Sequence, residues 1–458
     1  MTLLLWLACG EEDLTDDSHL DDTAVLSGET YEFLVDGQDT VDSSGQIFRH
    51  LLIDDMKGHA SGMTDRLNAG WAPAEGDVAA ELLFYLEFDD SVGGSLEHGK
   101  AELTSAKTYG DIASGKDLFG KLAGNDPKGQ HKDFTAELQG WDGVVGAEPL
   151  VWLWLDQLDA QAVAWAQGEL PQGPDGAPVP RVGVTPEGQD LVQLLDKFLR
   201  GAVAFSQASD DYLDDDLEGH GLNSDHLTIE GGTTALEHGW DEGFGYFGAS
   251  RDYGLRSDGD VAEETAFDSD GDGDIDLLRE LSWGHCVNAS KRDAGALAPT
   301  DFSGRAWLGF LNGRALLAAT SGVGLSPEQA EELRAWRDDA VLAWEQAIAA
   351  SVVHYLNEVL VDMDSFGGED YDFGAHAKHW SEAKGFALTL QFNPRSPLSD
   401  EAFLDLHAEL GTQPVLDEAG PEQATAYAAG LNEAKAILAE AYGFDSANLG
   451  EDDGSQGW

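Results

Sequence analysis

The residues with the most specific chemical spacing lie in an aspartate-rich stretch between residues 268 and 280. Carboxylates stand at its first, third and fifth positions, Gly273 stands at the sixth, where a calcium loop turns sharply, and the seventh residue offers a backbone carbonyl. A hard cation such as calcium needs roughly six to eight oxygens gathered by one tight turn. The stretch therefore predicts a calcium site with ligands from Asp268, Asp270, Asp272, Asp274, Asp276 and Glu280.

The twelfth position of this stretch departs from the EF-hand pattern, because it holds Arg279 instead of glutamate. The bidentate ligand must then come from Asp276, from Glu280 or from elsewhere. We expect the ion to be structural and to fix the loop that precedes Ser282 to His285. The alternative interpretation is an acidic turn that holds no ligand.

A second group of chemical interest is His238, Asp241 and Glu242, within the segment Glu237 to Phe247. On a helix, residues three and four apart share a face, so these side chains suit a metal site or a histidine–carboxylate pair. The second histidine of a zinc-protease helix is missing. The alternative is a hydrogen-bond network at the end of a helix, with Trp240 and Phe244 in the core.

The third group is His376, His379 and Glu382, which recur every three residues and follow one helical strip. Two nitrogens and one oxygen could bind a transition metal, or the strip could line a polar groove. Interhelical polar contacts are the alternative. The sequence does not show whether His238 and His376 meet; if they do, a mixed histidine–carboxylate site inside a helical bundle becomes plausible.

The first ten residues, Met1 to Gly10, form a short apolar run that ends in a small residue and then Cys9. This pattern is typical of the end of a bacterial lipoprotein signal. It predicts a signal-like segment over 1–9, lipidation at Cys9 and an acidic tether over 10–28, whereas the alternative is a buried N-terminal turn. The other cysteine, Cys286, is then expected to be a lone, buried thiol.

The net charge of the chain excludes some classes of partner. The sequence has 87 Asp and Glu and 25 Lys and Arg, which gives a net charge of -62. Such a surface repels nucleic acids and anionic lipid headgroups, so we expect no nucleic-acid partner and membrane contact only through the lipid anchor. A hydrophobic fraction of 42% with 13 Trp still predicts a folded protein. The acidity fits either a solubility adaptation or cation binding.

Helical periodicity and caps dominate the chain, so we expect a mostly α fold of one or more helical bundles. The predicted domain spans 29–445, divided into two packed lobes over 29–183 and 184–445, and a frayed acidic tail follows over 446–458. The clearest helix starts at Ser326-Pro327 and runs towards Met363, and another starts at Thr185-Pro186 and ends near Ser206. Gly168 to Val184, rich in proline and glycine, is expected to be irregular. Other predicted helices cover Gln46–Met56, Asp77–Phe88, Leu150–Gln167, Thr233–Phe247, Gly304–Thr320, His376–Leu390, Asp400–Leu410 and Pro421–Tyr442.

With these motifs in view, the chain resembles an uncharacterised family of bacterial cell-envelope lipoproteins, domain of unknown function 4856, from Tyr31 to about Tyr442. The resemblance rests on Thr40–Gln46 with Arg49, Leu122–Asp126, His238–Gly248, the Asp-rich loop continuing to Val287–Asp293, and His379–Phe386 with Gln391–Pro394. It implies a helical envelope lipoprotein and no particular activity. The chain is also similar in kind to imelysin-like proteins, which are linked to iron uptake and described as peptidases, although their GxHxxE motif is not reproduced.

Two main functions follow as hypotheses. The first is an envelope-anchored, calcium-stabilised lipoprotein that binds iron, haem or another metal complex through His238, Asp241, Glu242, His376, His379 and Glu382, without catalysis. The second is a metal-dependent hydrolase in which His238 and His379 are ligands and Glu242 is the general base. A third is a structural scaffold for another envelope component, with exposed aromatic residues near Tyr246. No GxSxG elbow, P-loop, dinucleotide fingerprint or CxxC pair points to other chemistry.

Overall fold

The computed structural model describes residues 29–89, 94–96, 100–113, 115–126, 130–174 and 176–458. The predicted signal-like segment, the lipidation at Cys9 and the acidic tether lie outside the described residues.

The described chain is mostly helical, which confirms the predicted mostly α class. A short hairpin pairs β1 (Leu34–Val35) with the antiparallel β2 (Gln38–Asp39). The helices are α1 (Ser44–Ser61), α2 (Met63–Asn68), α3 (Asp77–Leu86), α4 (Lys100–Leu103), α5 (Ala147–Ala166), α6 (Leu191–Leu199), α7 (Ala235–Phe247), α8 (Asp258–Glu263), α9 (Gly284–Gly295), α10 (Phe302–Thr320), α11 (Pro327–Asp364), α12 (Phe373–Thr389), α13 (Asp400–Leu410) and α14 (Pro421–Tyr442).

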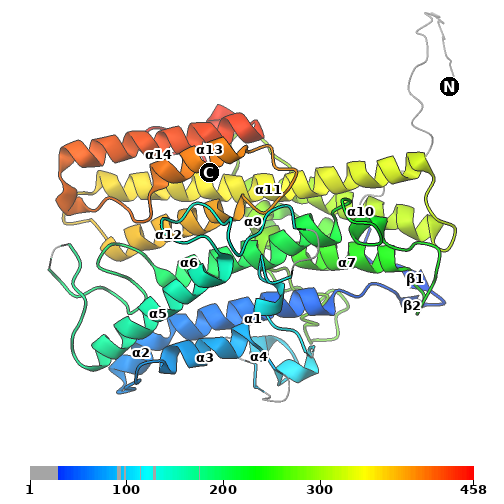
Figure 1. Cartoon of the computed structure of the whole chain (residues 1–458), viewed down its shortest axis with the longest axis horizontal. Helices are drawn as coiled ribbons and strands as arrows, with labels where there is room; N and C mark the ends of the chain where they lie inside the picture. The colour runs from blue at the N-terminus through cyan, green and yellow to red at the C-terminus, as the bar shows by residue number, and fades with distance from the viewer. Residues whose placement is uncertain (1–28, 90–93, 97–99, 114, 127–129, 175) are drawn as a thin grey trace, which may run out of the picture.

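The longest helix, α11, organises the stack of helices (Figure 1). It packs against α9, α10, α12 and α14. In Figure 1, α13 and α14 lie on one side of α11, while α1, α3 and α5 form the opposite side of the molecule, with α6 and α7 between them. The chain enters α11 as predicted, because Ser326 and Gln329 form a capping box and Pro327 occupies the first turn.

The predicted helix start at Thr185 is wrong. Residues 185–189 form a turn, in which the Thr185 amide donates to the Gln189 carbonyl at 2.8 Å. The helix begins after Asp190, whose carboxylate accepts from the amides of Val192 and Gln193 at 3.1 and 3.3 Å. Thr185 and Asp190, five residues apart, are both suitable N-cap residues. Asp190 is the cap in the structure, because its carboxylate accepts hydrogen bonds from the first amides of the helix. Beyond α6 the helix continues in π-helical form over Arg200–Phe205 and Ala208–Tyr212, past the predicted end.

Buried apolar residues from Tyr31 to Trp458 form one contiguous core, to which both predicted lobes contribute. A small satellite of Val179, Val184 and Ala377 lies beneath the irregular segment 168–184. The division into two lobes stays a prediction. Cys286 is free and fully buried, as expected, and burial raises the pKa of its thiol to about 12. Among the described residues, no helix combines the length and the apolar composition needed to cross a membrane.

The prediction of a frayed tail over 446–458 is wrong. Trp458 is only 7% exposed, and its indole donates to the carbonyl of Arg292 at 2.9 Å. The glycines that suggested disorder serve instead as turn residues, since Gly450, Gly454 and Gly457 all have positive φ. A Cβ on Gly454 would lie 2.2 Å from the Asn357 carbonyl oxygen, so the tail lies directly against α11.

Candidate functional site

The Asp-rich loop connects α8 to α9, and its two ends pair with each other. Its two ends meet in an isolated antiparallel bridge between Ala266 and Leu281, where the Phe267 amide donates to the Glu280 carbonyl at 3.0 Å. α8 ends at Glu263 and α9 begins at Gly284, so neither helix runs directly into the loop. The helix–loop–helix arrangement of an EF-hand is therefore not found within residues 258–295.

Inside the loop, the Asp268 carboxylate folds the turn around itself. It accepts hydrogen bonds from the amides of Gly271, Asp272 and Gly273 at 2.7, 3.1 and 2.9 Å. Gly271 and Gly273 both have positive φ, which a side chain would disfavour. The loop thus has the tight turn that the sequence predicted at its sixth position.

Three of the six predicted calcium ligands converge. One carboxylate oxygen from each of Asp268, Asp270 and Glu280 lies within 4.8 Å of the other two. Glu280 is 6% exposed and accepts from Ser269 and from the Asp276 amide. Burial opposes its ionisation, but these hydrogen bonds prevail and lower its pKa.

The arginine at the twelfth position turns away from the loop. Arg279 pairs with Glu32 at 3.1 Å and with Asp39 at 2.8 Å, next to the N-terminal hairpin. Of the two residues expected as alternatives to Arg279, Asp276 and Glu280, it is Glu280 whose carboxylate gathers with those of Asp268 and Asp270.

The remaining predicted ligands point to other partners. Asp274 accepts from the Ser105 amide at 2.5 Å and from the Ser105 hydroxyl at 2.7 Å. Asp272 accepts from the Asp274 amide at 2.8 Å, and Asp276 accepts from the Leu278 amide at 2.9 Å. These three carboxylates stabilise turns or attach the loop to its surroundings.

On α7, His238 and Glu242 pair as their spacing predicted, with 3.7 Å between Nε2 and Oε2. The other oxygen of Glu242 accepts from the Gln46 side chain at 2.7 Å. Asp241 does not join this pair; it is fully buried and accepts from the Tyr31 hydroxyl at 3.0 Å and from Arg314 at 2.9 Å. Tyr246 is fully buried too, so the expected exposed aromatic surface near it is wrong.

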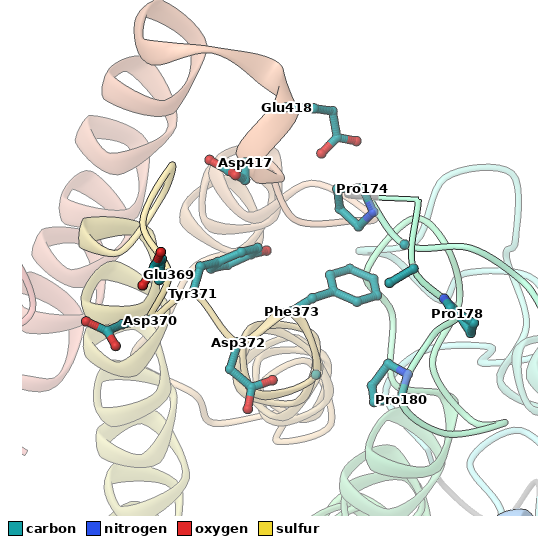
Figure 2. A pocket seen from close by; sticks show the side chains of 13 residues that line it. Pro174, Pro178, Pro180, Glu369, Asp370, Tyr371, Asp372, Phe373, Asp417 and Glu418 are labelled. Atoms are coloured by element: carbon teal, nitrogen blue, oxygen red, sulfur yellow. The ribbon is translucent and has the colours of Figure 1, made fainter.

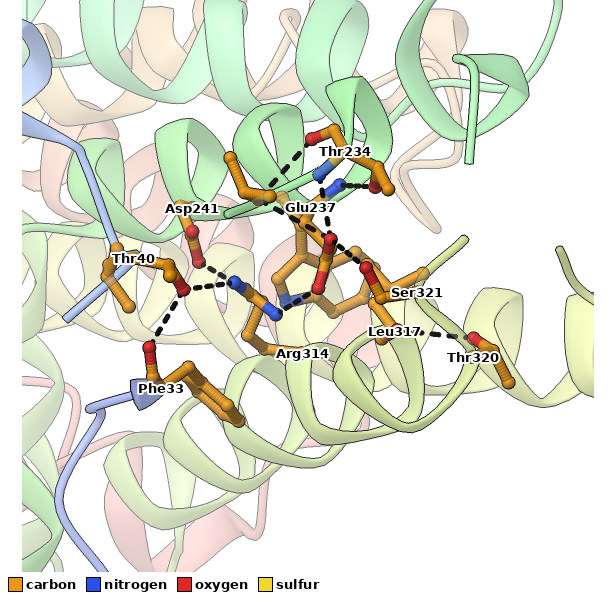
Figure 3. A network of polar contacts seen from close by, with 12 residues as sticks. Phe33, Thr40, Thr234, Glu237, Asp241, Arg314, Leu317, Thr320 and Ser321 are labelled. Carbon is orange, nitrogen blue, oxygen red and sulfur yellow. Dashed lines mark hydrogen bonds and ion pairs between the residues drawn. The ribbon is translucent and has the colours of Figure 1, made fainter. Parts of the chain in front are cut away.

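Figure 3 shows the network that engages Asp241. The Arg314 guanidinium on α10 donates to Asp241 and to Glu237, each at 2.9 Å, and to the Thr40 hydroxyl at 3.2 Å. Glu237 also closes the capping box with Thr234 at the start of α7. Burial dominates the environment of Asp241 and raises its pKa to about 6 although Arg314 opposes the shift. The network joins α7, α10 and the N-terminal segment, which matches the predicted alternative of a structural hydrogen-bond network.

The three predicted residues on α12, His376, His379 and Glu382, also have different surroundings. His379 pairs with Asp362 of α11 at 2.8 Å. Glu382 lies 3.3 Å from the Lys197 amine and 3.6 Å from the Lys378 amine. His376 is fully buried, with the backbone of Val415 beside its ring.

The six residues predicted for a second metal therefore form no common site. Across the described ranges, Asp268, Asp270 and Glu280 are the only three His, Cys, Asp or Glu residues whose ligand atoms gather within 4.8 Å. The spacing along one helix was read correctly for His238 and Glu242. The partners supplied by neighbouring helices, which the sequence does not show, separate the others.

A cavity of about 450 Å³ lies beside the N-terminal end of α12 (Figure 2). Tyr371 and Phe373 place their rings against it, and Pro174 faces them from the irregular segment after α5. The Tyr371 ring lies 5.9 Å from the His376 ring, centroid to centroid. The acidic residues that line the cavity are Glu369, Asp370, Asp372, Asp417 and Glu418. No local sequence pattern indicates this cavity, because three distant segments contribute to its walls.

Comparison with known proteins covers one part of the chain. Neither curated proteins nor solved structures provide a match. A family model matches residues 151–265, which include α6, α7 and the motif His238–Gly248 but end before Asp268. The family that this model represents is described as a domain of unknown function (DUF4856), and residues 151–265 match it.

Proposed function

We propose that the protein is a calcium-stabilised helical binding protein without catalytic activity. The observation that carries the calcium site is the convergence of Asp268, Asp270 and Glu280 within 4.8 Å at a glycine turn. Carboxylate and carbonyl oxygens are the ligands that calcium prefers. The net charge of -62 adds a favourable field for cations.

The role that we propose for calcium is to clamp the loop against two other segments. The Ile275 amide donates to the Leu103 carbonyl at 3.1 Å, and Asp274 binds Ser105, so the loop contacts the end of α4. Arg279 reaches the N-terminal hairpin through Asp39. Calcium would stabilise the loop conformation that makes these contacts, and so would favour the folded state.

Calorimetric titration of calcium into protein treated with EDTA tests this proposal. We expect about one equivalent of calcium to bind, and Asp270→Asn to weaken binding by about tenfold or more because a charged ligand is lost. Asp274→Asn is the matched control, since it removes the same charge from a side chain that binds Ser105. Equal affinity in both variants, or no binding to the wild type, would contradict the site.

Iron, haem or another metal complex is the ligand class that we propose for a second site, at His376. Burial lowers the pKa of His376 to about 4, so its imidazole is neutral and retains a lone pair for a metal. The ring of Tyr371, which lines the 450 Å³ cavity, lies 5.9 Å from the His376 ring, centroid to centroid. Haem titration followed by absorbance would show a spectrum that His376→Ala removes and His379→Ala keeps. If both variants behave alike, His376 is not the ligand.

Binding is better supported than hydrolysis. A hydrolase would bring His238, His379 and Glu242 to one metal, yet His238 pairs with Glu242 and His379 pairs with Asp362. No gathering of three ligand atoms within the described residues includes either histidine. The hydrolase alternative stays a prediction without a geometric basis.

The envelope location that we propose rests on the sequence pattern around Cys9. Mass spectrometry of the protein extracted from bacterial membranes would detect a diacylglycerol adduct on Cys9. Cys9→Ala should then move the protein from the membrane to the soluble fraction. An unmodified Cys9 in membrane-free protein would contradict the anchor.

A further inference from the structure

Two basic side chains lie buried against each other between α12 and α13. The Lys384 amine lies 2.8 Å from Nδ1 of His407. Lys384 is fully buried, and His407 is 6% exposed. A buried cation is normally paired with an acid, because the desolvation of an isolated charge is costly. Here a base is paired with a second base, so protonation of either one affects the other.

One loop, residues 138–145 (the covering loop), lies over this pair. Its Trp141 is 8% exposed, and the centroid of the indole ring lies 5.9 Å from the Lys384 amine. Gly140 lies against His407, since a Cβ at this position would be 3.0 Å from two carbons of the imidazole ring. The covering loop therefore packs on both members of the pair.

Hydrogen bonds hold the covering loop at its base. The Leu138 amide donates to the Val145 carbonyl at 2.8 Å, which joins the two ends of the loop. Gln139 exchanges two hydrogen bonds with the side chain of Gln391, at 2.9 and 3.2 Å. The part of the loop that contacts Lys384 and His407 can thus leave the pair while its base stays attached.

No contacting acid neutralises a charge on this pair. Among the described residues, no acidic side chain lies within 4.0 Å of the Lys384 amine. Burial lowers the pKa of Lys384 to about 7, although the charge of Asp142, in the covering loop, opposes this shift. Burial, and next the charge of Lys384, hold the pKa of His407 well below its ordinary value, although the backbone of Ala387 favours protonation of the ring.

The charged and titratable groups on the other elements near α12 and α13 have partners of their own. These are Lys197 of α6 with Asp196 and Glu382, Arg200 after α6 with Asp196, Asp362 of α11 with His379, Glu345 of α11 with Asn393, Tyr427 of α14 with the Leu410 carbonyl, and Glu409 of α13, which lies against Gly430 of α14. Lys384, His407 and Asp142 are therefore the groups that set the charge beneath the covering loop.

We propose that the covering loop is an acid-sensitive lid over the Lys384–His407 pair. While the lid is closed, the two neutral bases accept at most one proton, which is held between the amine and Nδ1. A second proton occupies the lone pair of Nδ1 and places two positive charges side by side in a buried site, where they repel strongly. Release of the covering loop lets solvent hydrate both charges.

Acid favours the open lid at two steps. An exposed lysine titrates near pH 10.5, whereas Lys384 under the closed lid has a pKa of about 7, so the open state binds more protons between these values. An exposed histidine titrates near pH 6.5, whereas burial keeps His407 neutral well below that pH. The equilibrium constant for opening should therefore rise by up to about tenfold for each pH unit that is lost within either window.

Hydrogen exchange of the full chain, followed by mass spectrometry from pH 9 to pH 5, tests the lid. After correction for the pH dependence of intrinsic exchange, the opening constant of a peptide over 138–145 should rise at least about tenfold from pH 9 to pH 7. It should rise about tenfold again from pH 6.5 to pH 5. Peptides from α14 are the internal reference and should not follow this rise. An opening constant that does not change with pH, or a rise that α14 shares equally, overturns the proposal.

Variants assign the two steps to the two bases. Lys384→Met keeps an apolar chain and removes the amine, so it should abolish the rise between pH 9 and pH 7, whereas His407→Gln should abolish the rise between pH 6.5 and pH 5. The matched control is Lys378→Met, on the same helix, whose side chain is 44% exposed and which should keep the wild-type profile. If Lys384→Met does not fold, His407→Gln and the wild-type profile still decide the outcome. Wild-type profiles in both variants overturn the proposal.

Discussion

At the scale of single residues, Arg314 is the cation that pairs with two buried carboxylates, those of Glu237 and Asp241. Its guanidinium is 1% exposed and lies between Glu237 and Asp241, both of them almost fully buried. The sequence offered Asp241 as a metal ligand, because its spacing from His238 fits one helical face. In the folded protein Asp241 is instead one acceptor in a buried ion network.

Replacing Arg314 with methionine should therefore destabilise the fold strongly. The variant would leave Glu237 and Asp241 buried without a cation, and breaking a buried pair in this way costs about 3 to 5 kcal/mol. The control is Arg305→Met, since Arg305 is about one third exposed and pairs with the exposed Asp339, so about 1 kcal/mol or less is expected. Urea unfolding of both variants measures the difference. Equal losses would contradict a special role for Arg314.

Glu345, in the middle of α11, should make stability depend on pH. Burial raises its pKa to about 7, against the hydrogen bonds from Ser396, Asn393 and Tyr442. The raised pKa means that the folded state retains a proton that the unfolded state loses near pH 4.5. The stabilisation from this proton is complete below pH 4.5 and disappears as the pH rises to about 7, with a total of roughly 3 kcal/mol.

The free energy of unfolding of the wild type and of Glu345→Gln, measured from pH 4 to pH 8, tests this pH dependence. The wild type should lose stability relative to the variant across the window from pH 4.5 to 7. A difference between the two proteins that stays constant over this range would contradict a raised pKa for Glu345.

At the scale of helices and turns, the sequence predicted elements well where one cap signal had no competitor. α13 and α14 have the predicted bounds, and α11 starts at the predicted capping box. α6 was misplaced because Thr185-Pro186 and Asp190 are both suitable caps, and the choice depends on tertiary contacts. Asp190 also binds Arg181 at 2.6 Å, which no local pattern reveals.

The predictions for the candidate site were likewise successful where they depended on local sequence and unsuccessful where they depended on other helices. The tight turn of the Asp-rich loop and the convergence of Asp268, Asp270 and Glu280 were predictable because these residues are close in sequence and the turn needs glycine. The contacts of His376, His379 and Asp241 depend on residues from other segments of the chain, such as Asp362 for His379 and Arg314 for Asp241. The 450 Å³ cavity depended on three distant segments, for which spacing within one helix carries no information.

The corrected helix start can be measured. Asp190→Ala should cost about 2 to 4 kcal/mol, because it removes the N-cap of α6 and leaves Arg181 without its buried partner. Thr185→Ala, at the start that the sequence suggested, should cost about 1 kcal/mol, since it removes only the hydrogen bond from the Gln189 amide. Chemical unfolding compares the two. A larger loss for Thr185→Ala would mean that the turn, and not Asp190, holds the helix start.

At the scale of the whole molecule, part of the scarce basic side chains is buried and does not face solvent. Of the 25 Lys and Arg, eight are buried in the described structure: Arg49, Lys197, Arg200, Arg251, Arg314, Arg337, Lys384 and Lys435. Four of these, Lys197, Arg200, Arg314 and Arg337, form ion pairs. The 87 acidic residues thus face solvent with even fewer compensating cations than the composition suggests. Repulsion among surface carboxylates opposes folding, whereas the buried pairs are shielded from added salt.

Salt should therefore stabilise this protein even when calcium is absent. Raising NaCl from 10 mM to 1 M shortens the Debye length from about 30 Å to about 3 Å, so surface repulsion is screened while buried pairs such as Arg314–Asp241 are little affected. We expect the Tm of EDTA-treated protein to rise by about 5 °C or more over this range. Choline chloride at equal ionic strength should give a similar rise if the cause is screening, and a smaller one if sodium binds at specific sites. A Tm that falls with salt would mean that exposed ion pairs, and not repulsion, dominate the surface.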